Sequence, residues 1–136
     1  MSKKGSSKAD VLKRVPLFEE CSKADLAKIA RIADEIDLKE GKELIREGEL
    51  ARQFFILTDG RADVRRNGRK VNTLGPGDFF GEIGLVTDRV TSASVTTTTP
   101  ARALVITRAS YKTLLRESPG IQLKVLQALA QRISGD

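Results

Sequence analysis

Glycines divide the chain between Asp37 and Ile106 into short runs, at intervals of roughly ten residues, as is typical of strands joined by turns. Asn67-Gly68, between VRR and RKV, predicts a two-residue hairpin turn, because a type I′ turn needs a positive φ at both central positions. The apolar run FFIL at 54–57 predicts a buried strand. Further turns are expected at Gly41, Gly48, Gly60 and Gly75. Many short strands with regular turns indicate a β barrel or a jelly roll.

Helical periodicity lies on both sides of this region. On the N-terminal side, Ser22 followed by Asp25 resembles a capping box, and apolar residues at helical spacing follow it. They predict an amphipathic helix of about four turns. Its apolar face is expected to hold Leu26, Ile29, Ala30 and Ala33. Pro16 separates this helix from a short apolar turn before it.

The C-terminal side is also expected to be helical. Ser110 is predicted to cap a short helix, YKTLLRES, and Pro119 to interrupt it. A last helix then carries an apolar stripe, which either covers a ligand or packs on the strands. The stripe consists of Gln122, Val125, Leu126, Leu129 and Ile133. The expected fold is therefore mainly β, with helices at both ends.

The length and the rare residue types limit the classes of function. A chain of 136 residues fits one domain, which we place at residues 9–136 after a polar, lysine-rich lead-in at 1–8 expected to be disordered. Cys21 is the single cysteine, and the chain has no histidine, which is the commonest metal ligand and general base. We therefore expect no enzymatic activity, metal site or cofactor.

Charge and hydropathy indicate where the protein acts. No apolar run approaches the roughly 18 residues of a membrane helix, and the N-terminus lacks the apolar core of a signal peptide. The sequence thus predicts a soluble, cytoplasmic protein without a membrane partner. The net charge of +6 is spread along the chain, with no basic stripe interleaved with aromatics, so no direct nucleic-acid partner is expected. A basic surface also suits a small anionic ligand.

The segment FFGEIGLV at 79–86 differs from the strands around it. It follows a Gly-Pro-Gly turn, and its length suits one helical turn beginning near Gly81, whose free N–H groups favour an anion. Glu82 beside that anion can accept a hydrogen bond from a sugar hydroxyl. Together they predict a site for a phosphorylated ribose. The alternative is a routine turn in which the helix dipole alone favours the glutamate.

Several stretches resemble the cyclic nucleotide-binding domain, a family that includes catabolite-activator-type regulators, kinase regulatory subunits and gated channels. They are KELIREGEL, FFILTDGRADV, LGPGDFFGEIGLV, TSASV and ARALVITRASYKTLL. The resemblance covers about Val11 to Ile133. It implies an eight-stranded jelly roll flanked by helices, with a phosphate-binding cassette at about residues 80–95.

The resemblance also implies roles for cassette residues. Gly81 and Glu82 match the pair that meets the ribose 2′-hydroxyl, and Ser92 matches a position that touches phosphate. The backbone amides of Ile83 and Gly84 match those that face the phosphate. Leu85 and Ala93 complete the expected ligand-binding set.

One cassette position departs from the family pattern. Such cassettes usually end in Pro-Arg-small-Ala-Ser/Thr-Val, whereas this chain has Val-Thr-Ser-Ala-Ser-Val at 90–95, so Thr91 stands in place of the phosphate-binding arginine. Arg89 lies two residues earlier, where an extended chain would point it to the same face as Thr91. It is either a replacement ligand or a solvated loop residue.

Two functions follow from this pattern. The first is a noncatalytic regulatory domain that binds cAMP or cGMP, with affinity weakened by Thr91. The alternative is a degenerate domain of the same fold that acts as a protein-interaction or regulatory module without nucleotide. In either case a regulated protein or a second copy is expected to dock through the terminal helices.

Overall fold

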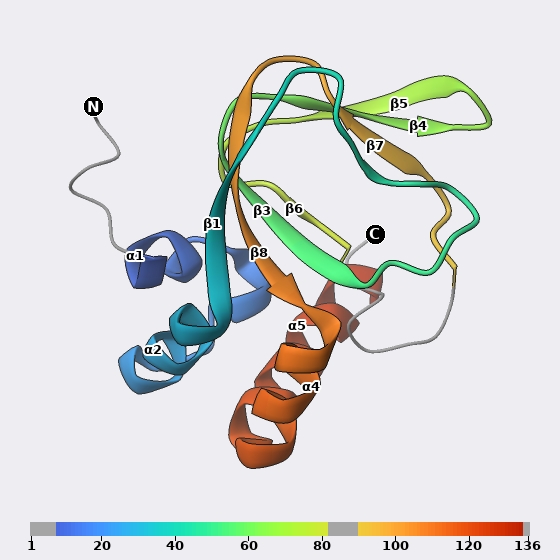
Figure 1. The fold of residues 1–136 in the computed structure, drawn as a ribbon. Coiled ribbons are helices and arrows are strands. Elements are labelled where there is room, and N and C mark those ends of the chain that lie inside the picture. The colour runs from blue at the N-terminus through green and yellow to red at the C-terminus, as the bar shows by residue number, and fades with distance from the viewer. Residues whose placement is uncertain (1–7, 82–89, 135–136) are drawn as a thin grey trace.

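The computed structural model describes residues 8–81 and 90–134, and eight strands in these ranges form two antiparallel sheets (Figure 1). The first sheet has the order β1 (Ala33–Leu38), β8 (Ala101–Thr107), β3 (Gln53–Asp59) and β6 (Phe79–Phe80). The second has the order β2 (Glu43–Ile45), β7 (Ser94–Thr97), β4 (Ala62–Arg66) and β5 (Arg69–Leu74). Consecutive strands alternate between the sheets except for β4 and β5, which form a hairpin within the second sheet, and the predicted eight-stranded jelly roll is confirmed.

Strand β3 is apolar on both faces because it lies between two cores. Phe55 and Leu57 face the second sheet and pack in a cluster that includes residues of all eight strands. Phe54 and Ile56 point the opposite way and pack against the helices. The period of two along a strand places these pairs on opposite faces. The prediction of a fully buried strand at 54–57 is confirmed, since all four side chains are buried.

The helices lie together on one side of the sheets, although they come from both ends of the chain (Figure 1). They are α1 (Lys8–Lys13), the 3-10 turn η2 (Pro16–Phe18), α2 (Lys23–Ile32), α4 (Arg108–Glu117) and α5 (Pro119–Ser134). None of the helices in this part of the chain is long and apolar enough to span a membrane. The lead-in expected at residues 1–8 lies outside the described residues, except for Lys8, which begins α1.

The capping box of α2 is confirmed, but the helix is shorter than predicted. The Asp25 N–H donates to the Ser22 hydroxyl at 3.1 Å, and the Ser22 N–H donates to the Asp25 carboxylate at 3.0 Å. The helix ends at Ile32, and Ala33, expected on its apolar face, begins β1. Ala33 pairs there with Ile106 of β8. Pairing across the sheet thus overrides the local helical spacing.

The start of α4 also differs from the prediction. Thr107, the last residue of β8, caps the helix, and the Ser110 N–H donates to the Thr107 hydroxyl at 3.1 Å. Pro119 begins a second helix, as predicted. On α5, Val125 is buried whereas Leu126 is about half exposed, so the expected apolar stripe is not a single buried face. The side chains of Leu129 and Ile133 lie outside the description.

The hairpin turn between β4 and β5 has the predicted geometry. Asn67 and Gly68 both have positive φ, at 55° and 80°. The turn at Gly75 is also present, since the Asp78 N–H donates to the Gly75 carbonyl oxygen at 3.0 Å. The residues within each turn were therefore sufficient to predict both turns from the sequence.

Candidate functional site

The structure describes the two ends of the expected cassette. Gly81 lies at one end, and Thr91, Ser92 and Ala93 lie at the other. The remaining expected ligand-binding residues fall outside the described residues. They are Glu82, Ile83, Gly84, Leu85 and Arg89. The geometry of the site is therefore built from its flanks and from the strands that hold them.

Gly81 occupies a position that only glycine fits. It follows β6, where Phe80 pairs with Phe55 and stacks on its ring at a centroid distance of 5.0 Å. The φ of Gly81 is +88°, and a Cβ atom there would lie 2.5 Å from the carbonyl oxygen of Gln53. The left-handed conformation and the close backbone contact both exclude a side chain. The N-terminal end of the cassette is thus fixed against β3.

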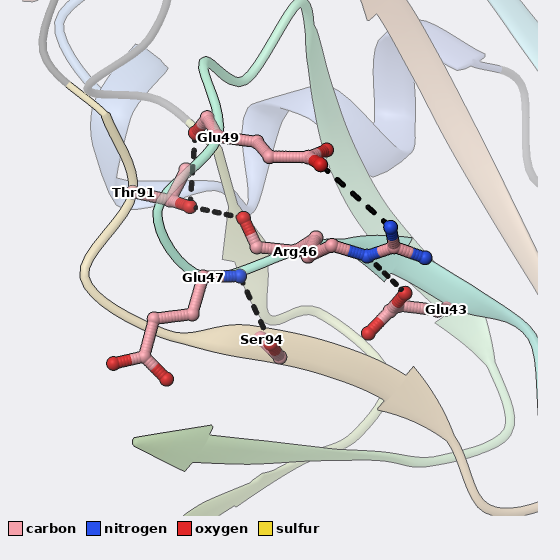
Figure 2. A network of polar contacts seen from close by, with 6 residues as sticks. All are labelled: Glu43, Arg46, Glu47, Glu49, Thr91 and Ser94. Atoms are coloured by element: carbon pink, nitrogen blue, oxygen red, sulfur yellow. Dashed lines mark hydrogen bonds and ion pairs between the residues drawn. The ribbon is translucent and has the colours of Figure 1, made fainter. Parts of the chain in front are cut away.

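Thr91 is bound to the turn that connects β2 and β3 (Figure 2). Its hydroxyl oxygen lies 2.7 Å from the carbonyl oxygen of Arg46 and 3.1 Å from that of Glu49. The Thr91 N–H donates to the Glu49 carbonyl, and the Thr91 carbonyl accepts from the Gly48 N–H, both at 2.9 Å. All of its polar groups therefore hold this turn, and the hydroxyl hydrogen is committed to a main-chain oxygen.

The residues after Thr91 extend this connection. The Ser92 carbonyl accepts a hydrogen bond from the Arg66 guanidinium at 3.2 Å, and the Ser94 hydroxyl accepts from the Glu47 N–H at 2.9 Å. Ser92 itself is exposed, and its hydroxyl makes no hydrogen bond to other described residues. Ala93 is half-buried. Ser92 is thus the described cassette residue whose hydroxyl remains available to a ligand.

A cavity of about 240 Å³ lies beside this turn. Gln53 and Ile45, the two residues that close on Gly81, belong to its wall. The described residues that line it are Leu44, Ile45, Arg46, Glu49, Leu50, Ala51, Arg52, Gln53 and Phe55. Gly81, Thr91 and Ser92, which were expected to share a pocket, are not among them. The structure places Gly81 and Thr91 next to the segment that walls the cavity, whereas Ser92 contacts Arg66.

Sequence reasoning missed the charged residues of this wall. The Arg46 guanidinium lies 2.9 Å from Glu43 and 3.7 Å from Glu49 (Figure 2). The hydrogen bond to Glu43, followed by the charges of Glu43 and Glu49, raises the pKa of Arg46. The alternation of charge in KELIREGEL was visible in the sequence, but nothing local indicated that this segment lies against Thr91. The motif thus did not reveal that an exposed, paired arginine lies in the wall of this cavity.

Comparisons with known proteins agree with this architecture. Residues 35–118 match the family model for the cyclic nucleotide-binding domain. The chain is 34% identical over 107 residues to the cAMP-dependent protein kinase regulatory subunit of Eremothecium gossypii, covering 78% of this chain and 23% of that protein. It is 26% identical to the CRP-like cAMP-activated global transcriptional regulator of Mycobacterium tuberculosis, covering 91% of this chain and 58% of the relative.

A solved structure resembles nearly the whole chain. It is the N-terminal domain of a transcriptional regulator from Streptomyces coelicolor A3(2), with a TM-score of 0.82 and 26% identity over 93% of this chain and 94% of that domain. The family match covers more than half of the sequence, and the jelly roll with its flanking helices agrees with it. The chain belongs to the cyclic nucleotide-binding domain family.

Proposed function

We propose that this chain is a noncatalytic regulatory domain that binds a cyclic purine nucleotide at residues 80–95. The observation that carries the proposal is Gly81, whose left-handed backbone lies against Gln53 with no space for a side chain. This contact holds the start of the proposed cassette at a defined position beside β3. The two curated relatives carry cAMP in their names, so cAMP is the first ligand to test and cGMP the second.

The expected roles of the cassette residues form part of this proposal. Glu82 accepts a hydrogen bond from a ribose hydroxyl, and the amides of Ile83 and Gly84 face the phosphate. The Ser92 hydroxyl, which has no hydrogen bond to the other described residues, donates to the same phosphate. Leu85 and Ala93 contribute contacts around the ligand. Arg89 is the cassette's own candidate for a cation.

The affinity is expected to be weak because residue 91 brings no charge. An arginine contact to phosphate is charge-assisted and is worth about 1.5 to 3 kcal/mol, or roughly tenfold to a hundredfold in affinity. Thr91 cannot replace it, since its hydroxyl hydrogen is bound to the turn at Arg46 and Glu49. The proposed domain thus retains the ribose half of the site and lacks one cation of the phosphate half.

The same observation favours a second candidate function. A Thr91 that serves only to hold the β2–β3 turn is consistent with a domain that has kept the scaffold and lost the nucleotide. Such a domain would act through its surface. On α5, Leu123 and Leu126 are 58% and 49% exposed, and we propose this face as the contact for a regulated protein or a second copy.

Isothermal titration calorimetry separates the two candidates. Wild-type protein is titrated with cAMP, cGMP and the noncyclic 5′-AMP, and the same titrations are made with Glu82→Ala. Saturable binding of a cyclic nucleotide that Glu82→Ala weakens by about tenfold or more supports the sensing domain. The exposed Glu40→Ala is the matched control and should leave the dissociation constant unchanged. Absence of binding by the folded wild type supports the second candidate.

A further inference from the structure

A second cavity, of about 460 Å³, lies between α2 and α4. Its size falls in the range of about 300 to 1,000 Å³ that small-molecule sites occupy. None of the described cassette residues lines it, and it shares no lining residue with the cavity beside Thr91. Its wall comes from α2, from α4 and from the residue that joins α4 to α5: Lys28, Arg31, Ile32, Ser110, Thr113, Leu114, Glu117 and Ser118.

Part of this wall is apolar and continuous with the protein core. Leu114 is buried and Ile32 is half-buried, and both pack in the core cluster that includes the helices. Lys28 and Arg31 lie three residues apart on α2, on the helix face that also carries Ile32. Both cations are exposed. The cavity therefore combines an apolar surface with positive charge, which suits an amphipathic ligand.

The charged side chains of the wall do not neutralise one another. Glu117 is its single carboxylate, and within residues 8–81 and 90–134 it forms no ion pair with Lys28 or Arg31. The hydrogen bond from the Lys28 Nζ is a long one, at 3.5 Å from the Ser118 hydroxyl oxygen. An ammonium has three donors and a guanidinium five. The wall thus carries one positive charge in excess, and its cations keep donors for an anion.

Ser118 adds a buried donor to this wall. Its side chain lines the cavity although the residue is only 9% exposed. The Ser118 hydroxyl accepts from Lys28 but donates to no described residue. A buried donor without an acceptor costs free energy, which a ligand oxygen at this place would recover. The ammonium of Lys28 and the hydroxyl of Ser118 therefore converge on one position for an anionic oxygen.

We propose that the cavity between α2 and α4 binds a small organic monoanion with an apolar body. Lys28 and Ser118 donate to its carboxylate, and Arg31 adds positive charge on the same wall. The apolar body lies against Ile32 and Leu114. Glu117 offsets one of the two cations, so the wall matches a single negative charge better than two. This site is additional to the nucleotide site proposed above and does not rest on it.

Octanoate is the probe, because it joins one carboxylate to an unbranched apolar chain. Wild-type protein is titrated by calorimetry with octanoate, acetate, octylammonium and the dicarboxylate suberate. We expect saturable binding of octanoate, weaker binding of suberate, and none of acetate, which lacks the apolar body, or of octylammonium, which has the opposite charge. Amide NMR spectra should locate the octanoate-induced shifts in α2, in α4 and at Ser118.

Variants of the wall test each contact. Lys28→Gln and Arg31→Gln should each weaken octanoate binding by about fivefold, the upper value for an exposed charge pair. Lys23→Gln is the matched control on α2, since Lys23 is exposed but does not line the cavity. Glu117→Gln should tighten octanoate binding and bring suberate to a similar affinity, because it removes the negative charge of the wall. Urea midpoints show that each variant is folded.

Several results would overturn the inference. Failure of the folded wild type to bind octanoate is one, and equal binding of octanoate and octylammonium is another, because a charge-blind site does not use the cations. Equal affinities of Lys28→Gln, Arg31→Gln and Lys23→Gln, or NMR shifts confined to other elements, would place the ligand elsewhere. Titration of the same variants with cAMP reports on the nucleotide site separately, so either proposal can fail while the other stands.

Discussion

The Thr91 hydroxyl oxygen lies 2.7 Å from the main-chain oxygen of Arg46, a residue 45 positions earlier in the chain. This hydrogen bond connects the end of the cassette to the β2–β3 turn. Position 91, where the sequence comparison predicts a phosphate-binding arginine in related cassettes, therefore holds two backbone segments together in this protein. The consequences concern stability as well as ligand affinity, and they can be measured separately.

Thr91→Val should destabilise the fold. Valine keeps the shape of the side chain but leaves the Arg46 and Glu49 carbonyls without the hydroxyl donor, at about 0.5 to 1.5 kcal/mol. Urea denaturation should show a lower midpoint with an unchanged slope. Thr96→Val, on β7, is the matched control, since the Thr96 hydroxyl makes no hydrogen bond within residues 8–81 and 90–134. Equal midpoints for the two variants would contradict the role of Thr91.

Thr91→Arg should exchange stability for affinity. The hydroxyl bonds are lost, so the urea midpoint falls as it does for Thr91→Val. The new guanidinium lies on the cassette, and cyclic nucleotide binding should tighten by about tenfold or more. Calorimetry with cAMP measures the gain. An affinity no better than that of Thr91→Val would show that position 91 no longer faces the phosphate.

Gly81→Ala should be more destabilising than Gly77→Ala. Both glycines have a positive φ, +88° and +93°, so each substitution pays a similar conformational penalty of about 1 to 2 kcal/mol. Of these two glycines, Gly77 has open space around an added Cβ atom. An added Cβ atom at Gly81 would lie 2.5 Å from the backbone oxygen of Gln53. Overpacking adds about 1 to 3 kcal/mol. Equal unfolding free energies for Gly81→Ala and Gly77→Ala would mean that Gly81 is not tightly packed against β3.

Asp25→Asn should reduce stability more at neutral than at acidic pH. The hydrogen bond from Lys124 on α5, at 2.7 Å, and those at Ser22 lower the pKa of the Asp25 carboxyl below its ordinary value of 3.8. The ionised form is thus favoured in the folded state. The contribution of the ionised Asp25 carboxylate to folding stability is complete above about pH 4, which is the pKa of this carboxyl in the unfolded chain. It is lost as the pH falls through the lower pKa of the folded state.

Thermal or urea unfolding at pH 7 and pH 2.5 would test this. We expect Asp25→Asn to cost about 1 to 2 kcal/mol at pH 7 and much less at the acidic pH. Asp34→Asn, at an exposed position of β1, is the control and should have a small effect at both. A loss of stability from Asp25→Asn that is independent of pH would show that the charge is unimportant.

Tyr111→Phe should stabilise the protein. The side chain is fully buried in the helix-facing core, and its hydroxyl has no hydrogen-bond partner among the described residues. Burial also raises the pKa of Tyr111 above its ordinary value of 10.0, so the group stays neutral. Removing an unsatisfied buried hydroxyl recovers up to about 1 to 3 kcal/mol. A lower urea midpoint for the variant would reveal a partner for this hydroxyl.

Features specified by neighbouring residues could be predicted from the sequence. The Asn67-Gly68 turn needs only two adjacent residues with positive φ, and the Ser22–Asp25 capping box forms within three residues of the chain. The burial of both faces of β3 could also be predicted from the sequence. A strand that packs on both faces lacks the alternation of polar and apolar residues found in a strand with one solvent-exposed face. These predictions depended on local conformation and hydrophobicity alone.

Features created by distant contacts could not be predicted in this way. Ala33 has helical spacing but belongs to a strand because β8 pairs with it. Thr107 ends β8 and caps α4 at the same time, so the cap was placed three residues too late. The position of Arg46 beside Thr91 depends on the jelly-roll topology, which brings β2 next to β7. No pattern within either segment encodes that proximity.

The two anchors of the cassette lie on one short stretch of chain. Gly81 rests against Gln53, and Val90 forms a bridge with Leu50, so residues 82–89 join two points that the segment 50–53 already fixes. Closing a longer loop between fixed points costs little, about 0.6 kcal/mol for each doubling of its length. A longer connection between these two points is therefore expected to cost the jelly roll little stability. The scaffold thus specifies where this part of the chain leaves and rejoins it, through residues 50–53, and leaves the length in between unconstrained.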